Sequence, residues 1–140
     1  MVQFSGADPR NGTLKTGTTV SGPGLLLTND STNNTLDLTA ANEIAIGVSA
    51  GDSTRDVDGV LQTAAGATVS FFPLGGVLMV QSEASQTYTT GLLVYAQADG
   101  LVGTTSSSRK LLGIYVGEGE TTSSSAGDMI PVMTAGAATA

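Results

Sequence analysis

The chain has 140 residues, of which 12% are charged, and it carries a formal net charge of −7 with neither His nor Cys. The missing His and Cys remove the commonest general base, the commonest metal ligand and the thiolate nucleophile. The five basic residues are scattered along an acidic chain, so they cannot neutralise a run of phosphates. The composition therefore excludes much enzyme chemistry and argues against nucleic acid as a partner, and we expect no cofactor.

The length and the apolar content fit one folded domain without a membrane span. Hydrophobic residues make up 40% of the chain, which is more than a disordered segment carries. No apolar run approaches 18 residues, and no basic region followed by an apolar stretch opens the sequence. We therefore expect a soluble protein that is made in the cytoplasm.

Residues 1–20 differ from the rest of the chain, because they are rich in Thr, are interrupted by Gly and Pro, and hold few large apolar side chains. This composition predicts an extended N-terminal arm. The arm's three sizeable apolar residues, Val2, Phe4 and Leu14, are candidate anchors for contact with a partner.

After the arm, short apolar runs recur with turn residues between them. They cover residues 25–27, 36–38, 44–48, 69–74, 77–80, 92–95, 111–116 and 129–133. Short runs at this spacing, rich in Val, Ile and Thr, are typical of an all-β fold, here a small β-barrel or sandwich. At most one short helix or turn is expected, over residues 37–46, and the paired glycines at 75–76 predict a hairpin turn.

The sequence also contains an internal echo. Residues 24–27 resemble 91–94, residues 46–48 resemble 112–114, and residues 65–69 resemble 126–130, in the same order each time. We therefore predict a single β domain over 21–135 built from two similar halves, 22–81 and 89–135, followed by a flexible tail at 136–140. The alternative is a chance echo in a sequence rich in Gly, Leu and Val.

The apolar cluster around residues 71–80 is expected to supply core. Neighbouring residues on a strand point to opposite faces, so Phe71 and Phe72 cannot both point inward. One of them must face solvent, a second layer or a partner. Phe71, Phe72 and Leu78 are therefore candidate residues for an interface between subunits.

The acidic residues cluster in places that resemble loops. Asp52, Asp56 and Asp58 lie within eight residues and precede Gly59, which suggests either a solvated hairpin loop or a structural cation site, since Ca²⁺ prefers clustered oxygens. The spacing lacks the alternating ligand pattern of a calcium loop, so the solvated loop is favoured. No metal ligand set and no catalytic residue is assigned, and we expect no enzyme.

Taken together, these segments resemble the bacteriophage head decoration, or capsid cement, proteins, a family that includes the lambda-type head stabilisation proteins. The resemblance rests on the Thr- and Gly-rich arm, the apolar strand at 25–28, the Ala-Ile-Gly-Val element at 45–48 and the strand with a glycine turn at 68–76. It continues in the second half at 91–95, 99–100, 112–114 and 127–132. These are patterns of strands and turns, and no binding motif is transferred.

The resemblance implies a compact, β-tulip-like domain that forms a homotrimer on the outer surface of the expanded capsid. Its partner would be the major capsid protein, and its location the virion. An arm that adds a strand to the coat protein would gain main-chain hydrogen bonds as it orders. Binding the expanded shell in preference to the immature shell would then stabilise the expanded shell.

Two other functions remain open from the residues. A carbohydrate-binding or adhesin module, on a virion surface or a tail fibre, would need a concave aromatic patch, for which Tyr88, Tyr95 and Tyr115 are the candidates. A carboxylate-dependent hydrolase would need acids such as Asp56 or Glu118 in a walled cleft.

Overall fold

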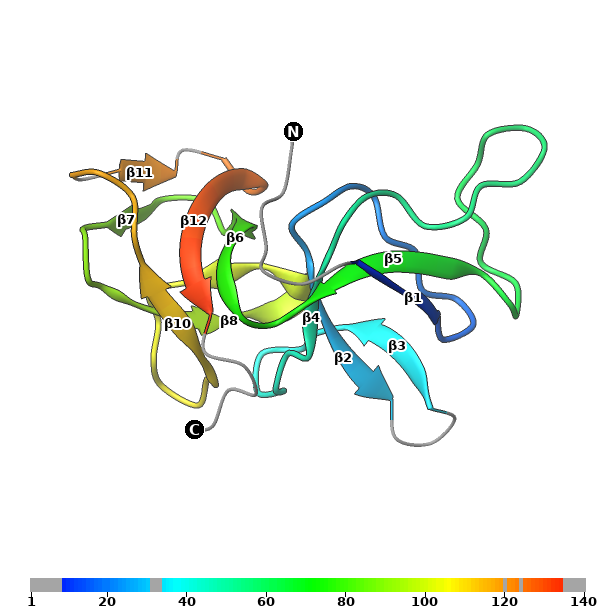
Figure 1. Ribbon diagram of the computed structural model, residues 1–140, viewed down its shortest axis with the longest axis horizontal. Coiled ribbons are helices and arrows are strands. Elements are labelled where there is room, and N and C mark those ends of the chain that lie inside the picture. The colour runs from blue at the N-terminus through cyan, green and yellow to red at the C-terminus, as the bar shows by residue number, and fades with distance from the viewer. Residues whose placement is uncertain (1–8, 31–33, 120, 124, 135–140) are drawn as a thin grey trace.

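The computed structural model describes residues 9–30, 34–119, 121–123 and 125–134, and it is almost entirely β-structure (Figure 1). The strands are β1 (Arg10–Thr13), β2 (Leu26–Asp30), β3 (Thr35–Leu38), β4 (Gly47–Ser49), β5 (Thr68–Pro73), β6 (Gly76–Ser82), β7 (Gln86–Tyr88), β8 (Leu93–Ala96), β9 (Val102–Gly103), β10 (Leu111–Tyr115), β11 (Thr121–Ser123) and β12 (Asp128–Thr134). One 3₁₀ turn, η1 (Ala98–Gly100), is the helical element of the described residues. The all-β fold predicted from the sequence is confirmed, and residues 37–46 hold the end of β3 and a turn.

The first half of the chain forms a five-stranded sheet with the strand order β1-β5-β4-β2-β3. All of its neighbouring strands are antiparallel. A parallel bridge between Leu14 and Leu36 brings the end of β1 against β3, so the sheet curls toward closure. Its interior is an apolar cluster of Leu14, Val20, Leu25, Leu27, Leu36, Ala67 and Val69.

The second half forms a closed barrel with the strand order β10-β12-β6-β9-β8. Its pairs are antiparallel except for β6 and β9, which meet in parallel at Ser82 and Val102. A short ribbon of β7 and β11 lies at the end of the barrel away from the first half (Figure 1). Valine and leucine side chains together with Tyr88 and Tyr115 form the barrel core.

The two halves pair their strands in the same order and in the same register. β1, β5, β4, β2 and β3 correspond to β6, β12, β10, β8 and β9, and the closing contact is parallel in both halves. Gly47 lies opposite Leu27 and Pro73, and its counterpart Gly113 lies opposite Val94 and Thr134. The echo in the sequence therefore coincides with a repeated strand arrangement.

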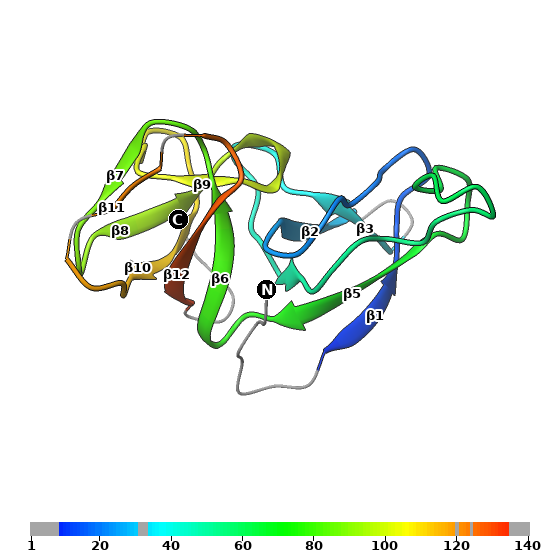
Figure 2. The same cartoon turned by 90° about the horizontal axis from the view of Figure 1, so that it is seen from above.

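The boundary between the halves differs from the predicted one. The repeated unit starts at β1 in the first half and at β6 in the second, whereas the sequence echo suggested 22–81 and 89–135. Gly75 and Gly76 both have positive φ, of 141° and 70°. They do not form a hairpin, because β5 and β6 are not partners in any sheet. They turn the chain from the first half into the second (Figure 2).

The predicted arm is also corrected by the strand pairing. Residues 10–13 form β1 and pair with β5, while Leu14 and Val20 are fully buried in the first half. Residues 10–20 are therefore part of the domain, because β1 supplies the strand that lets the first sheet curl. Residues 1–8, with Val2 and Phe4, and the predicted tail at 136–140 lie outside the described residues.

The halves pack against each other through one face of the first sheet. Leu26, Val48 and Phe72 are cross-strand neighbours, and they pack with the core cluster of the barrel rather than with the interior of their own half. The backbone N–H of Gln81 donates to the carbonyl of Gly24 at 2.8 Å, and that of Gly100 donates to Thr39 at 3.0 Å. The core of the barrel thus extends onto this face of the first sheet, while the interior of the first half keeps an apolar cluster of its own.

Candidate interaction surface

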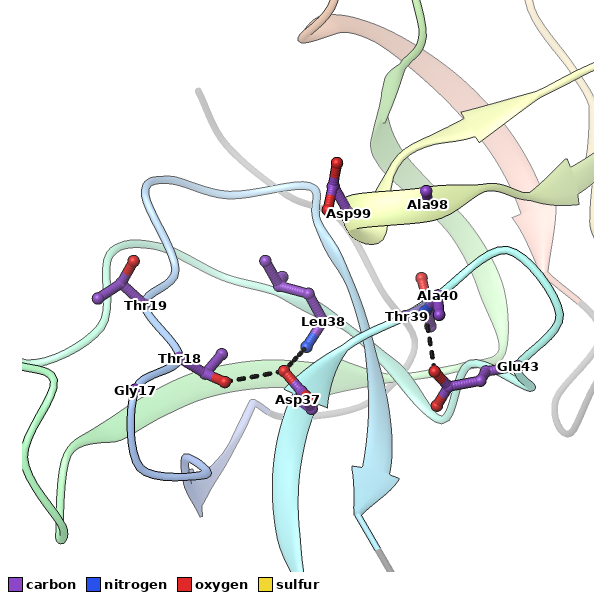
Figure 3. Close-up of a pocket in the computed structure, with 10 residues that line it drawn as sticks. All are labelled: Gly17, Thr18, Thr19, Asp37, Leu38, Thr39, Ala40, Glu43, Ala98 and Asp99. Atoms are coloured by element: carbon purple, nitrogen blue, oxygen red, sulfur yellow. Dashed lines mark hydrogen bonds between the residues drawn. The ribbon is translucent and has the colours of Figure 1, made fainter.

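A pocket of about 430 Å³, lined by polar and apolar atoms in similar amounts, opens where the two halves meet (Figure 3). Its acids are Asp37 and Glu43 from the first half and Asp99 from the 3₁₀ turn of the second. The carboxylate of Asp37 accepts hydrogen bonds from the Thr18 hydroxyl and from the Leu38 N–H, both at 2.8 Å. Asp37 therefore holds the loop at Thr18 and the end of β3 in place.

The acidic segment at 52–59 lies in the loop between β4 and β5, which projects from the end of the first half (Figure 1). Arg55 pairs with the carboxylate of Asp52, and Asp56 accepts the backbone N–H groups of Asp58 and Val60 at 2.9 and 3.0 Å. The carboxylates of Asp52 and Asp56 thus shape the loop itself. Among the described residues, no group of three or more acidic side chains is arranged to hold a metal ion.

The tyrosines do not form a surface platform. Tyr88 and Tyr115 are buried in the barrel, with 0% and 2% of their surface exposed, and their rings stack with centroids 5.5 Å apart. The Tyr88 hydroxyl lies 2.6 Å from that of Ser82 inside the core. Two of the three tyrosines that a carbohydrate site would need are therefore core residues.

The buried hydroxyl of Tyr88 makes stability depend on pH. Burial raises the pKa of Tyr88 above its ordinary value of 10.0, the Ser82 hydrogen bond lowers it, and the charge of Glu83 raises it. Above pH 10 the unfolded chain loses the tyrosine proton before the folded chain does, so stability falls as the pH rises from 10 toward the folded pKa. We expect Tyr88→Phe to flatten this alkaline loss in denaturant titrations.

The matched control for that experiment is Tyr95→Phe, since Tyr95 is only partly buried. At neutral pH, Tyr88→Phe should cost about 1 kcal/mol for the lost hydrogen bond. An alkaline loss of the same size in Tyr88→Phe and in the unmodified chain would contradict the role assigned to Tyr88.

One row of exposed apolar side chains runs across the outside of the barrel. Val77 lies opposite Met133, Met133 opposite Ile114, and Ile114 opposite Leu93. Cross-strand partners share one face of a sheet, so the four side chains form a continuous strip. Their exposed fractions are 39%, 49%, 40% and 44%. We call these four residues the barrel stripe.

The interface residues predicted from the sequence lie elsewhere. Leu14 and Leu78 are 1% and 0% exposed and cannot contact a partner, because each fills the interior of its own half. Phe71 packs in the core of the first half and Phe72 against the second. For Phe72, the second layer expected from the sequence is thus the other half of the same chain.

The barrel stripe was not predicted. Its members are scattered over four strands that are distant in sequence, and nothing in residues 91–95 tells which of the two leucines points outward. The only signal of exposure is that Ile114 and Met133 lie one position from buried neighbours, because adjacent residues on a strand point to opposite faces. The strand register that joins them is a product of the tertiary fold.

The structure thus defines a class of fold: a tandem pair of five-stranded β units, one a closed barrel, with an apolar stripe on the barrel. The described residues contain no helix with the length and apolar content that a membrane crossing needs. No model of a known protein family matches the sequence, and no curated protein matches it. Among solved structures, the fold is similar to that of the head fibre gp8.5 N base of bacteriophage phi29.

That similarity extends over nearly the whole of both proteins. It covers 95% of this chain and 99% of the phi29 chain, with a TM-score of 0.61 and 17% sequence identity. At this identity the comparison shows a shared fold. The two halves and their order along the chain are therefore part of the fold that is shared with the phi29 head fibre base.

Proposed function

We propose that this chain is a structural protein of a phage head, and that it binds the outer surface of the expanded capsid and stabilises it. The observation that carries the proposal is the near-complete match to the base of a phage head fibre. A shared fold alone does not define a function, so the proposal also draws on the charge of the chain.

The charge of the chain supports an outer location. With a net charge of −7 and only five basic residues scattered along the chain, the protein should be repelled by packaged DNA. The partner in this proposal is the major capsid protein. Preferential binding to the expanded lattice would stabilise that lattice by mass action, and many weak contacts on one particle would suffice.

The location is tested by immunogold labelling with an antibody raised against the purified chain. Particles from a lysate of the phage that encodes the chain should carry label on their heads. Label on the tails would support the adhesin function instead, and unlabelled particles would overturn the proposal.

The stabilising role is tested by cosedimentation of the purified chain with expanded and with unexpanded heads. We expect saturable binding to the expanded heads, weaker binding to the unexpanded heads, and a higher temperature of head disruption when the chain is bound. Equal binding to both forms would contradict capsid stabilisation, because a ligand shifts an equilibrium only by its difference in affinity.

A truncation tests the role proposed for the N-terminal residues. Removal of residues 1–8 leaves β1 and its pairing with β5 intact, so the domain should unfold at an unchanged denaturant concentration. If Val2 and Phe4 anchor the chain on the coat protein, the truncated chain should bind expanded heads at least about tenfold more weakly, which corresponds to about 1.4 kcal/mol. Unchanged binding would remove the N-terminal residues from the interface.

A further inference from the structure

The barrel stripe has a counterpart in the first half that is already covered by another β unit. Leu93, Ile114 and Met133 are paired across β8, β10 and β12. Leu26, Val48 and Phe72 are paired in the same way across β2, β4 and β5, which are the corresponding strands of the first half. The two rows therefore occupy equivalent places on two similar units.

The two rows differ in what lies over them. Leu26 and Val48 are both 0% exposed, and they join the core cluster of the second half. The barrel stripe is 39% to 49% exposed. The same outer face is thus buried in the first half, where the barrel packs on it, and exposed in the second half.

A pair of side chains beside the barrel stripe is also apolar, whereas the equivalent pair in the first half is polar. Met79 and Pro131 are the next cross-strand pair on the outer face of β6 and β12. The corresponding pair on β1 and β5 is Asn11 and Ser70, which are exposed and joined by a 2.6 Å hydrogen bond. At this position the first half therefore has a polar pair, whereas the second half has methionine and proline.

The apolar face also continues an existing interface. Gln81 and Met129, the next pair along β6 and β12, lie beside the first half. The Gln81 side chain donates to the carbonyl of Pro23 at 2.8 Å, and Met129 reaches Gly24. From this covered end, the face runs through Met79 and Pro131 to the barrel stripe. A continuous apolar face of this kind marks an interaction site on a protein surface.

We infer that the barrel stripe is the contact surface for a second copy of this chain. The occupant is a second copy because the equivalent row is already covered by a β unit of this same fold.

The inference is tested by light scattering on the full chain in solution. The unmodified protein should have a mass above 13.9 kDa, the mass of one chain, and this mass should rise with protein concentration. The double variant Ile114→Asp with Met133→Asp should stay at the mass of one chain, because a carboxylate at each position would be desolvated in the contact. The matched control is Asn11→Asp with Ser70→Asp, on the polar face of the first half, which should associate like the unmodified protein.

Circular dichroism separates loss of association from loss of folding. If the Asp variant does not fold, Ile114→Thr with Met133→Thr keeps a strand-forming side chain and should weaken association in the same direction. A single-chain mass for the unmodified protein up to its solubility limit would overturn the inference. So would an oligomer of unchanged mass in folded stripe variants.

Head binding distinguishes this inference from the proposed function. If the unmodified protein is a single chain, and the folded stripe variants fail to bind heads, the stripe contacts the coat protein and the inference is overturned while the proposed function stands. If the chain associates through the stripe but labels no head, the proposed function fails and the inference stands.

Discussion

Gly113→Ala is expected to unfold the barrel or to destabilise it by about 3 kcal/mol or more, although it adds one methyl group. A Cβ at this position would overlap the carbonyl oxygen of Met133 and lie 2.9 Å from its carbonyl carbon. These are backbone atoms of β12, which is paired with β10 at this point. They cannot move aside without breaking the strand pairing that closes the barrel.

Gly47→Ala tests the same constraint in the first half. Its Cβ would lie 2.7 Å from the carbonyl oxygen of Phe72 and 2.6 Å from the ring of Phe71. The ring can shift slightly but the carbonyl cannot, so a loss of about 1–3 kcal/mol is expected.

Gly51→Ala is the matched control for both glycine variants, because a Cβ at Gly51 meets nothing within 4 Å. The measurement is the free energy of unfolding in a denaturant titration followed by circular dichroism. If Gly113→Ala and Gly51→Ala unfolded at the same denaturant concentration, the close approach of β10 and β12 would be contradicted.

Val48→Asp is expected to cost more than about 4 kcal/mol, whereas Ile114→Asp should cost about 1 kcal/mol. The two residues hold equivalent places in β4 and β10 and are both aliphatic. Val48 is 0% exposed between the halves, while Ile114 is 40% exposed. A carboxylate at position 48 would be buried without a partner, but at position 114 it remains in contact with water.

The comparison isolates burial, because Asp lowers strand propensity by a similar amount at both positions. Both variants are unfolded in denaturant at low protein concentration, where association does not add to stability. If the two variants lost the same amount of stability, either the halves would not pack through Val48 or Ile114 would not face solvent.

Much of the local structure was accessible from the sequence. Short apolar runs separated by turn residues predicted an all-β fold, and the echo of Ile46-Gly47-Val48 in Leu112-Gly113-Ile114 coincides with matched strands in the two halves. Gly47 and Gly113 lie in the middle of these echoed segments, and a Cβ at either one would meet a carbonyl of the neighbouring strand.

The contact residues were less accessible, and the errors have a common physical origin. Leu14 looked like an anchor on a free arm, because the sequence around it is rich in turn residues. It is buried since β1 pairs with β5, more than 50 positions later in the chain. Leu78 was a candidate residue for a subunit interface, yet it fills the barrel because β6 lies between β12 and β9.

By itself, then, the amino-acid sequence determined what is local: strand-forming runs, the turns between them, two glycines that admit a close neighbour, and an acidic chain without His or Cys. The tertiary structure alone decided which face of each strand is covered. Val48 and Ile114 have similar side chains and similar neighbours in sequence, but one is buried and the other exposed. The reason is that burial depends on which unit packs on a strand from elsewhere in the chain, and within the described residues such a unit covers this face in the first half alone.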